Sequence, residues 1–241
     1  MAQIDVFEEL ASTSTKLMRR LARGEAVQEG YWIVADRQTA GRGRHGRSWF
    51  DGAGNFMGST FVSQRAGDPP LSTLALVAGL AVQSTIDEQL GVDRQALLKW
   101  PNDVLVDGAK IAGILLEGAP GGVVVGIGVN LEVAPKVLGR ATTALRKLGS
   151  TISRNTFAQL LADTFDREVE RWRTYGLEPI LGRWQAAAHP VGTPLLVGEP
   201  GEAQLEGTFA GLNPDGSLQL RLADGALRAI HAGEVNLVER N

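Results

Sequence analysis

The 241-residue sequence contains no cysteine, which excludes disulfide bonds, thiolate catalysis, iron–sulfur clusters and cysteine-ligated zinc. Its three histidines, His45, His189 and His231, lie far apart, and no pair has the helical spacing of zinc ligands. No run approaches the ~20 apolar residues that a membrane-spanning helix needs. Charged residues interrupt the N-terminal segment where a signal peptide would be apolar. These absences predict a soluble cytoplasmic protein.

The chain also lacks an excess of charge of either sign. Its 24 Lys and Arg residues stand against 27 Asp and Glu residues, which gives a formal net charge of −3. A protein that coats nucleic acid would be strongly basic, so any anion-binding site here must be local. The hydrophobic content of 44% is that of an ordinary globular protein. The length suits a large domain, alone or with a small one.

Apolar spacing and turn residues predict an alternation of helices and strands before Pro190. A helix over 72–90 would begin with Ser72 as its cap and end at Gly91. The Asp107-Gly108 dipeptide predicts a hairpin over 103–118, because a type I′ turn needs positive φ at both residues. Other expected helices cover 12–23, 156–175 and 179–188, and other expected strands cover 31–36, 55–63, 96–100 and 123–131. The segment 132–154 is expected to be a loop with a short helix.

The character of the sequence changes near Pro190. Short apolar segments follow one another from there to the C-terminus, separated by turn sequences such as Asn213–Gly216 and Asp224-Gly225. Five short strands within ~50 residues are typical of a small SH3-like β-barrel. The chain is therefore expected to form two domains, residues 1–188 and 189–241.

The loop over 38–49 is the most informative segment. It holds Arg42, Arg44 and Arg47, interleaved with three glycines, Gly41, Gly43 and Gly46. Glycine lets the backbone approach a ligand closely, and arginine binds phosphate and carboxylate groups. A solvated basic loop or an RNA-binding arm is an equally good interpretation of this segment alone. Its match to the dinucleotide-binding pattern G-x-G-x-x-G is dismissed, because no helix begins after it.

Polar residues follow the expected strand over 96–100. Asn102 and Asp103 offer oxygen atoms beside Lys99, an arrangement that could hold Mg²⁺ with a triphosphate. Pro101-Asn102-Asp103 is also ordinary turn chemistry. Lys110 begins a very apolar strand, so its side chain either points into a pocket or extends to solvent.

Taken together, these residues indicate phosphate chemistry. Five cations, namely Arg42, Arg44, Arg47, Lys99 and Lys110, come from three segments that lie at strand ends or in adjoining loops. The sequence contains no recognisable nucleophile triad. Many cations, a candidate Mg²⁺ site and a stackable Trp49 favour nucleotidyl or phosphoryl transfer, in which positioning and charge neutralisation dominate catalysis.

Four motifs, in this order and spacing, resemble those of the biotin protein ligases: Gln38–Trp49, Lys99–Asp103, Lys110–Glu117 and Gly126–Asn130. The Ser12-Thr13 pair also sits where that family has a biotin-contacting turn, and the likeness covers essentially the whole chain. The resemblance implies an α+β fold. A mixed, largely antiparallel sheet would carry packed helices, as in class II aminoacyl-tRNA synthetases, beside a small C-terminal SH3-like barrel.

The resemblance also implies a two-step, ATP-dependent reaction. Biotin and ATP would form biotinyl-adenylate with release of pyrophosphate, with Mg²⁺ as the metal ion. A lysine of a biotin carboxyl carrier protein, a domain of acyl-CoA carboxylases, would then accept the biotin. The implied partners include neither nucleic acid nor membrane, and a homodimer stays open beside a monomer.

The site residues that the resemblance implies fall into four groups. The biotin-binding group comprises Ser12, Thr13, Ser14, Gln38, Gly41, Arg42, Gly43, Arg44, Lys110 and Gly113. The group that binds ATP or the adenylate comprises Arg44, Arg47, Trp49, Asn102, Lys110 and Asn130. The catalytic group comprises Lys110, Arg44 and Lys99, and the Mg²⁺ ligands would be Asn102 and Asp103.

The chain departs from the family pattern at a few positions. Ser14 replaces the usual asparagine after Ser-Thr, and His45 replaces an arginine in the loop. Arg228 is only a weak candidate for the arginine that some relatives contribute from the C-terminal domain. Eleven residues precede Ser12, too few for the helix-turn-helix domain of bifunctional members, so no repressor function is expected.

Two other functions are compatible with parts of this sequence. A lipoate or octanoyl protein ligase shares the fold, but those relatives lack the full arginine–glycine loop found here. A non-catalytic protein that binds biotin or a nucleotide would be expected to lose a phosphate-handling cation, yet Arg44, Arg47, Lys99 and Lys110 are all present.

Overall fold

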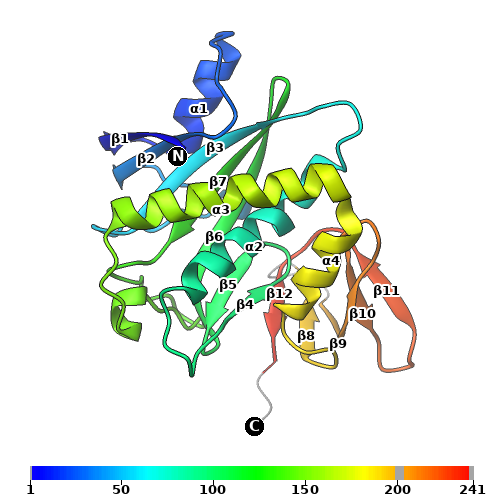
Figure 1. Ribbon diagram of the computed structural model, residues 1–241. Coiled ribbons are helices and arrows are strands. Elements are labelled where there is room, and N and C mark those ends of the chain that lie inside the picture. The colour runs from blue at the N-terminus through cyan, green and yellow to red at the C-terminus, as the bar shows by residue number, and fades with distance from the viewer. Residues whose placement is uncertain (1, 199–203, 239–241) are drawn as a thin grey trace.

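A seven-stranded mixed sheet forms the larger part of the molecule (Figure 1). The computed structural model describes residues 2–198 and 204–238. The strands lie in the order β1-β2-β3-β7-β6-β5-β4, and every neighbouring pair is antiparallel except β1 and β2. Their bounds are β1 Gln3–Leu10, β2 Tyr31–Gln38, β3 Phe56–Ser63, β4 Ala96–Lys99, β5 Asp103–Val106, β6 Ala109–Ala119 and β7 Gly122–Val129. This confirms the expected mixed, largely antiparallel sheet.

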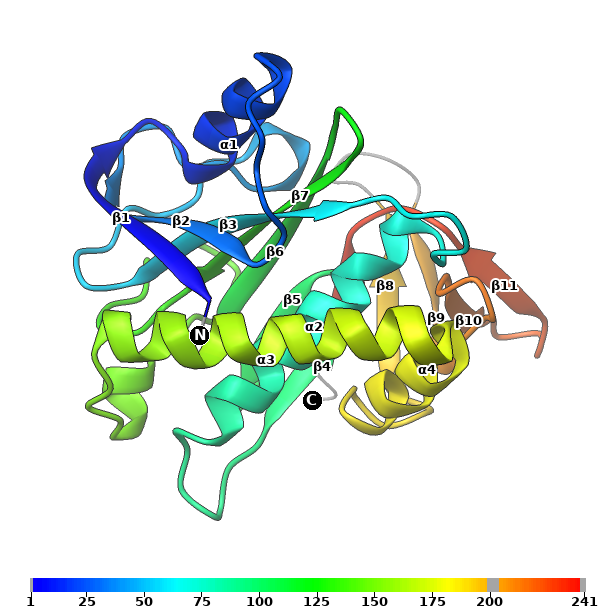
Figure 2. The same cartoon turned by 45° about the horizontal axis from the view of Figure 1, so that its top comes forward.

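Helices cover the two faces of this sheet unequally. The helices α2 (Leu74–Asp87) and α3 (Arg154–Tyr175) pack on one face, and α4 (Leu177–Ala186) follows α3. Helix α1 (Thr13–Ala22) lies on the other side of β2 and β3 from α3 (Figure 2). The part of this second face that α1 does not cover carries the site described below.

The alternation of side chains along β2 explains this arrangement. Trp32 points toward the α3 side, where its ring meets Phe165 edge-on at a centroid distance of 5.6 Å. Ile33, one residue further on, belongs to a separate cluster with Leu17 of α1. Both neighbouring residues are fully buried because successive side chains of a strand point to opposite faces.

A second, smaller sheet follows α4. Its strands β8 (Pro194–Val197), β9 (Leu205–Leu212), β10 (Leu218–Arg221), β11 (Leu227–Ile230) and β12 (Val235–Leu237) form an antiparallel sheet in the order β11-β10-β9-β8-β12. All five correspond to the short strands that the sequence predicts. The indole N–H of Trp100 donates to the carbonyl of Gly216 at 3.1 Å and ties this sheet to the larger part. The domain division at residue 188 stays a prediction.

Two sequence predictions about local structure are wrong. Helix α2 begins at Leu74 rather than at Ser72, because a 3₁₀ turn over Leu71–Thr73 precedes it. It ends at Asp87, before Gly91, because the Asp87 carboxylate accepts a hydrogen bond from the Ala96 amide at 2.7 Å and turns the chain into β4. The sequence reading also missed β1, a half-exposed edge strand that mixes charged and apolar residues.

The hairpin prediction is confirmed. Asp107 has φ 50° and Gly108 has φ 73°, as a type I′ turn between β5 and β6 requires. Helix α1 begins after Ser12 as expected, and α3 begins at Arg154, two residues before its expected start. The Ser12 and Ser153 hydroxyls cap these helices by accepting hydrogen bonds from the Thr15 and Thr156 amides. Within the described ranges, no helix is both long enough and apolar enough to cross a membrane.

A partly buried ion-pair cluster joins the C-terminal half of α3 to the segments around it. The Arg173 guanidinium donates to Glu29 at 2.7 and 3.0 Å and to the Ser63 carbonyl at 2.7 Å. Burial alone would raise the pKa of Glu29, but hydrogen bonds from Arg173 and Ser63 outweigh it and lower that pKa from 4.5 to about 2. The charged form of Glu29 therefore stabilises the fold.

Replacing Glu29 with glutamine is expected to flatten the acid side of the stability–pH curve. A lowered pKa gives stability that is present above the unfolded value of 4.5 and lost as the pH falls toward about 2. Denaturant unfolding across that pH window tests this, with Glu178→Gln as the control, since Glu178 is an exposed acid in α4. If both variants followed the wild-type slope, Glu29 would not be the group responsible.

Candidate functional site

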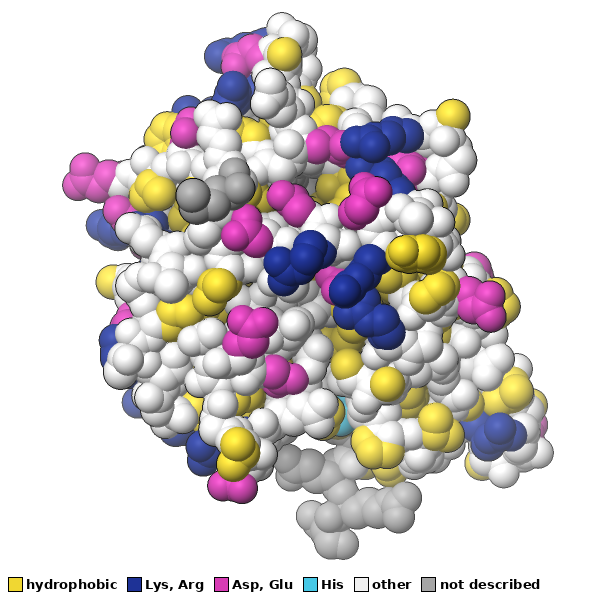
Figure 3. Space-filling view, viewed as in Figure 1, with side chains coloured by type: hydrophobic (Ala, Val, Ile, Leu, Met, Phe, Trp, Pro, Cys, Tyr) yellow, Lys and Arg dark blue, Asp and Glu magenta, His cyan; other side chains and the backbone are white. Residues whose placement is uncertain are grey.

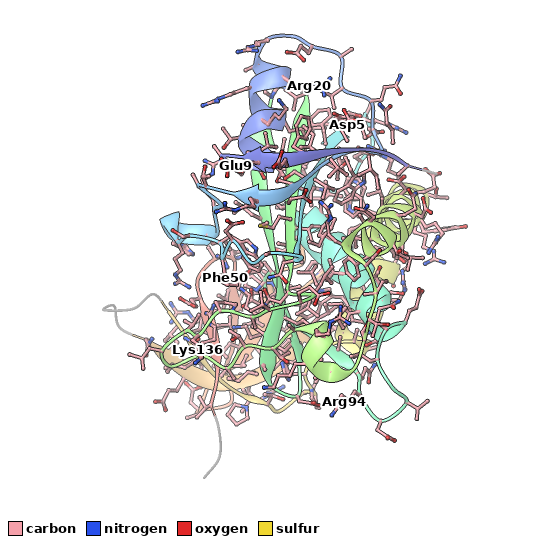
Figure 4. The ribbon with its side chains drawn as sticks, turned by 90° about the vertical axis from the view of Figure 1, so that its left-hand side faces the viewer. Asp5, Glu9, Arg20, Phe50, Arg94 and Lys136 are labelled. Atoms are coloured by element: carbon pink, nitrogen blue, oxygen red, sulfur yellow. The ribbon has the colours of Figure 1, made fainter. Side chains whose placement is uncertain are left out.

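A cavity of about 380 Å³ opens on the face of the large sheet that α2 and α3 do not cover. It extends from the N-terminal end of α1 to the small sheet, and Figure 4 shows Phe50 and Lys136 on this side of β6 and β7. Of the residues predicted from the sequence, those that line it are Ser12, Thr13, Ser14, Gln38, Arg42, Gly43, Arg44, Arg47, Trp49, Lys99, Asn102, Asp103, Lys110, Gly113 and Asn130. The fold thus brings together predicted residues from five separate segments of the chain.

The floor of the cavity consists of backbone. Gly113 of β6 and Gly128 of β7 lie side by side in register, and Gly126 lies two residues before Gly128. A Cβ atom on Gly126 would come 2.7 Å from the Ser14 hydroxyl, and one on Gly128 would collide with the Trp49 ring. Because these residues lack a Cβ atom, the Trp49 ring and the Ser14 hydroxyl can lie directly against the sheet and form the cavity wall above it.

One end of the cavity is lined by hydroxyl groups. The Gln38 side-chain oxygen accepts hydrogen bonds from the Thr13 amide at 2.7 Å and the Thr13 hydroxyl at 3.1 Å. The Ser59 hydroxyl lies 2.7 Å from that of Thr13 and 2.9 Å from that of Ser14. Ser59 was missed from the sequence because a serine within an apolar strand gives no signal. This buried network fixes neutral donors and acceptors at the cavity wall.

The other end is cationic around a single buried carboxylate. Lys110 Nζ lies 2.5 Å from one oxygen of Asp103, and Lys99 Nζ lies 3.4 Å from the other. Burial would raise the pKa of Asp103, but Lys110 and Lys99 outweigh it and lower that pKa. Burial lowers the pKa of Lys99, although Asp103 opposes this. The ion pairs keep Asp103 charged and hold both ammonium groups at the cavity wall.

These contacts do not fit the magnesium site that the sequence predicts. Each oxygen of Asp103 faces a lysine, and the Asn102 oxygen accepts from Arg44 at 3.3 Å. The Asn102 side-chain Nδ2–H donates to the Ile114 carbonyl at 2.7 Å. In the described part of the chain, no group of three Asp, Glu or His side chains is placed to hold a metal ion. The sequence shows that Asn102 and Asp103 are residue types that can bind Mg²⁺, but it does not show which side chains they pair with in the folded protein.

The arginine–glycine loop forms the roof. Its ends are joined by hydrogen bonds from the Trp49 amide to the Gly41 carbonyl at 2.9 Å and from the Gly43 amide to the Arg47 carbonyl at 2.7 Å. Arg42 pairs with Glu117 of β6 at 2.9 Å. Gly41 lies outside the cavity lining, and its assignment as a biotin contact stays a prediction. The Gly41 carbonyl closes the loop, and a Cβ atom there would crowd Gln38 and Trp49 at 3.1 Å.

Two buried polar atoms in this cavity have no hydrogen-bond partner among the described residues. They are the Trp49 indole nitrogen, a donor, and the Asn130 side-chain oxygen, an acceptor. The Trp49 ring lies over the glycine floor, with Lys110 Nζ 5.7 Å from its centroid. The Asn130 side chain is oriented by its Nδ2–H, which donates to the Thr143 carbonyl at 3.1 Å. Unsatisfied buried groups in a cavity point to a polar ligand.

Three consecutive residues at the start of β12 close the cationic end. The Gly233 carbonyl accepts from Arg44 at 3.3 Å, and the Val235 carbonyl accepts from Lys99 at 2.8 Å. The Glu234 carboxylate pairs with Arg47 and with Arg140. Glu234 and Arg140 were missed from the sequence, where neither belongs to a motif. The weak candidate Arg228 lies exposed on β11, outside the cavity lining.

Comparison with known proteins agrees with this geometry. The model of the biotin/lipoate A/B protein ligase family matches residues 6–133, and that of the biotin protein ligase C terminal domain matches residues 197–238. The chain is 37% identical to a biotin--[acetyl-CoA-carboxylase] ligase of Paracoccus denitrificans, over 94% of this chain and 98% of that protein. It is 34% identical to the ligase of the same description from Mycobacterium tuberculosis, over 97% and 88% of the two chains.

Solved structures show the same fold. The biotin protein ligase from Aquifex aeolicus, in complex with biotin and ATP, superimposes with a TM-score of 0.84 at 26% identity, and the match covers 100% of both chains. A ligase from Leishmania major in complex with biotinyl-5-AMP gives 0.66 at 26% identity, over 95% of this chain and 99% of that one. By its sequence, its sheet topology and the residues of its cavity, the chain belongs to the biotin/lipoate A/B protein ligase family.

Proposed function

We propose that this protein is a biotin protein ligase, which activates biotin with ATP and transfers it to a lysine of a biotin carboxyl carrier protein. The observation that carries the proposal is one cavity with two chemically different ends on a glycine floor. The neutral hydroxyl end suits a polar uncharged ring, and the cationic end suits phosphate. The curated relatives named above act on acetyl-CoA carboxylase, which makes its biotin carrier the proposed partner.

At the neutral end, the hydroxyl network would hold the ureido ring of biotin. That ring offers two N–H donors and one carbonyl acceptor, and the hydroxyls of Ser12, Thr13 and Ser14 with Ser59 can supply both kinds of partner. Ser14 stands where the family has asparagine, and its bond to Ser59 keeps a hydroxyl at that wall. The bicyclic ring would lie on the backbone of Gly126.

The carboxyl end of biotin would then reach the lysines and arginines, where adenylation takes place. A carboxylate oxygen attacks the α-phosphorus of ATP, the bond to the β-phosphate oxygen breaks, and pyrophosphate leaves with the bonding electrons. Both reacting groups are anionic, so Lys110 and Arg44 would neutralise the charge that gathers between them. Asn130 Oδ1 and Trp49 would face the adenine ring, the former accepting from its exocyclic amine.

Transfer would follow at the same place. The neutral ε-amine of the carrier lysine attacks the acyl carbon of biotinyl-adenylate, AMP leaves as the phosphate anion, and the amine gives up a proton. The mixed anhydride would be hydrolysed by water, so closure of the arginine–glycine loop protects it. No step is assigned to a metal ion, because the cavity side chains do not form a site for one.

The proposal includes no nucleic-acid function. Two of the three arginines of the loop already face acids, Arg42 with Glu117 and Arg47 with Glu234. Acidic and basic side chains also alternate over the α2–α3 face (Figure 3). A surface that binds a phosphate backbone would instead present unopposed positive charge.

The first experiment is ATP–pyrophosphate exchange with biotin, lipoate or no acid. Exchange that depends on biotin alone is expected, because the hydroxyl end fits a ureido ring. Exchange with lipoate alone would keep the adenylation chemistry and overturn the substrate assignment. No exchange with either acid from folded protein would favour a non-catalytic binding protein.

A further inference from the structure

One carboxylate at the mouth of the cavity is held by two arginines from separate parts of the chain. Arg140 lies in the loop after β7, and its Nη2 is 2.5 Å from Glu234 Oε1. Arg47 lies in the roof loop, donates to the same oxygen at 2.8 Å and also contacts Oε2. The mechanism above assigns no role to Arg140 or Glu234.

This pair of guanidinium groups stands at the phosphate end of the cavity. Burial is the main cause of the lowered pKa of Lys99, and the positive charge of nearby Arg140 lowers that pKa further. Lys99 and Arg44 both contact the residues that flank Glu234. Two cations, Arg47 and Arg140, therefore hold the Glu234 carboxylate, and two more, Arg44 and Lys99, contact the residues on either side of it.

The arrangement is the one that binds a terminal phosphate. Guanidinium forks hold carboxylate and phosphate oxygens with the same bidentate geometry. The Glu234 side chain is 13% exposed and that of Arg140 is 28% exposed, so solvent and a ligand can reach the pair. The Glu234 carboxylate therefore occupies an anion-binding position that a competing phosphate can still reach.

We propose that Arg140 is a phosphate-binding residue for the pyrophosphate part of ATP, and that Glu234 occupies this phosphate position until the nucleotide displaces it. This inference rests on the proposed function, because it assumes that ATP occupies the cavity. In the nucleotide-free protein, Glu234 keeps Arg47 and Arg140 together. When ATP binds, its terminal phosphates replace the carboxylate, and Glu234 moves out toward solvent.

The test compares Arg140→Ala, Arg140→Lys and Glu234→Gln in biotin-dependent ATP–pyrophosphate exchange. Arg140→Ala should raise the KM values for ATP and pyrophosphate about tenfold, the usual effect of losing one charge-assisted contact, and leave the KM for biotin unchanged. Arg140→Lys should recover part of the loss. Glu234→Gln should lower the KM for pyrophosphate several-fold, because it removes a competing negative charge.

The chain offers a matched control pair. Arg146 and Glu132 form a similar ion pair at 2.6 Å, but neither residue lines the cavity. Arg146→Ala and Glu132→Gln should leave all three KM values at those of the wild type. Thermal unfolding of each variant shows that the comparison concerns folded protein.

Two results would overturn the inference. Unchanged KM values for ATP and pyrophosphate in Arg140→Ala would remove Arg140 from phosphate binding. If Glu234→Gln bound pyrophosphate as weakly as Arg140→Ala does, Glu234 would help to form the phosphate site and would not compete with phosphate for it. Calorimetric titration of pyrophosphate alone compares the same variants without turnover. If the wild type failed to adenylate biotin, the proposed function would be contradicted. The titration would still show whether Arg140 binds phosphate.

Discussion

Replacing Lys110 with alanine is expected to reduce biotin-dependent ATP–pyrophosphate exchange by about 10²–10³-fold, the usual effect of removing one group that stabilises transition-state charge. Lys110 Nζ is held by Asp103 at 2.5 Å and lies beside the Trp49 ring. It is thus fixed where a carboxylate and a phosphate would meet. The turnover number at saturating biotin and ATP is the quantity to measure, because the missing charge acts mainly in the transition state.

The control for this variant is Lys147→Ala. Lys147 is an exposed lysine in the 3₁₀ turn Leu145–Leu148, and it does not line the cavity. Its removal should leave exchange at the wild-type rate. A Lys110→Ala protein that melts as a folded domain yet keeps most of its exchange rate would exclude Lys110 from adenylation.

The largest effect on stability is expected from Asp103→Asn. Asp103 is 7% exposed and lies between Lys99 and Lys110, so its loss leaves two partly buried ammonium groups without their counter-ion. Breaking a buried pair in this way typically costs about 3–5 kcal/mol. In a chain of this size each kcal/mol corresponds to about 2–4 °C, so the unfolding midpoint should fall by roughly 10 °C.

Asp107→Asn provides the comparison. Asp107 is a 60% exposed residue of the β5–β6 turn, where it pairs with Arg94 at 3.0 Å. Asparagine tolerates its positive φ, and an exposed ion pair contributes about 1 kcal/mol or less. If the two variants melted at the same temperature, Asp103 would not be the counter-ion that stabilises the buried charges of Lys99 and Lys110.

The motifs of the sequence locate the cavity well, for a physical reason. Ser12–Ser14, Lys99–Asp103 and Lys110 stand at or near the ends of strands and helices, and the sheet brings those ends together on its uncovered face. Residue type and spacing predict the gathering of cations at strand ends, whereas the inclusion of Ser12–Ser14 rests on the resemblance to the ligase family. Gly41 lies outside the cavity lining, where its carbonyl closes the loop.

The partners of each charge could not be read from the sequence. Asp103 has the residue type of a magnesium ligand, and only the structure shows a lysine at each of its oxygens. Glu234 and Arg140 lie 94 positions apart, and no local pattern connects them. Strand β1 was missed because an edge strand buries too little of either face to show a clear alternation.

The floor and the roof of the cavity differ in how firmly they are held. Strand β7 is hydrogen-bonded along its length to β3 on one side and β6 on the other, whereas two backbone hydrogen bonds join the ends of the roof loop. The roof loop is therefore the side of the cavity that can open. The residence time of a bound molecule should follow the opening rate of residues 41–49, while the glycines beneath decide only which molecules fit.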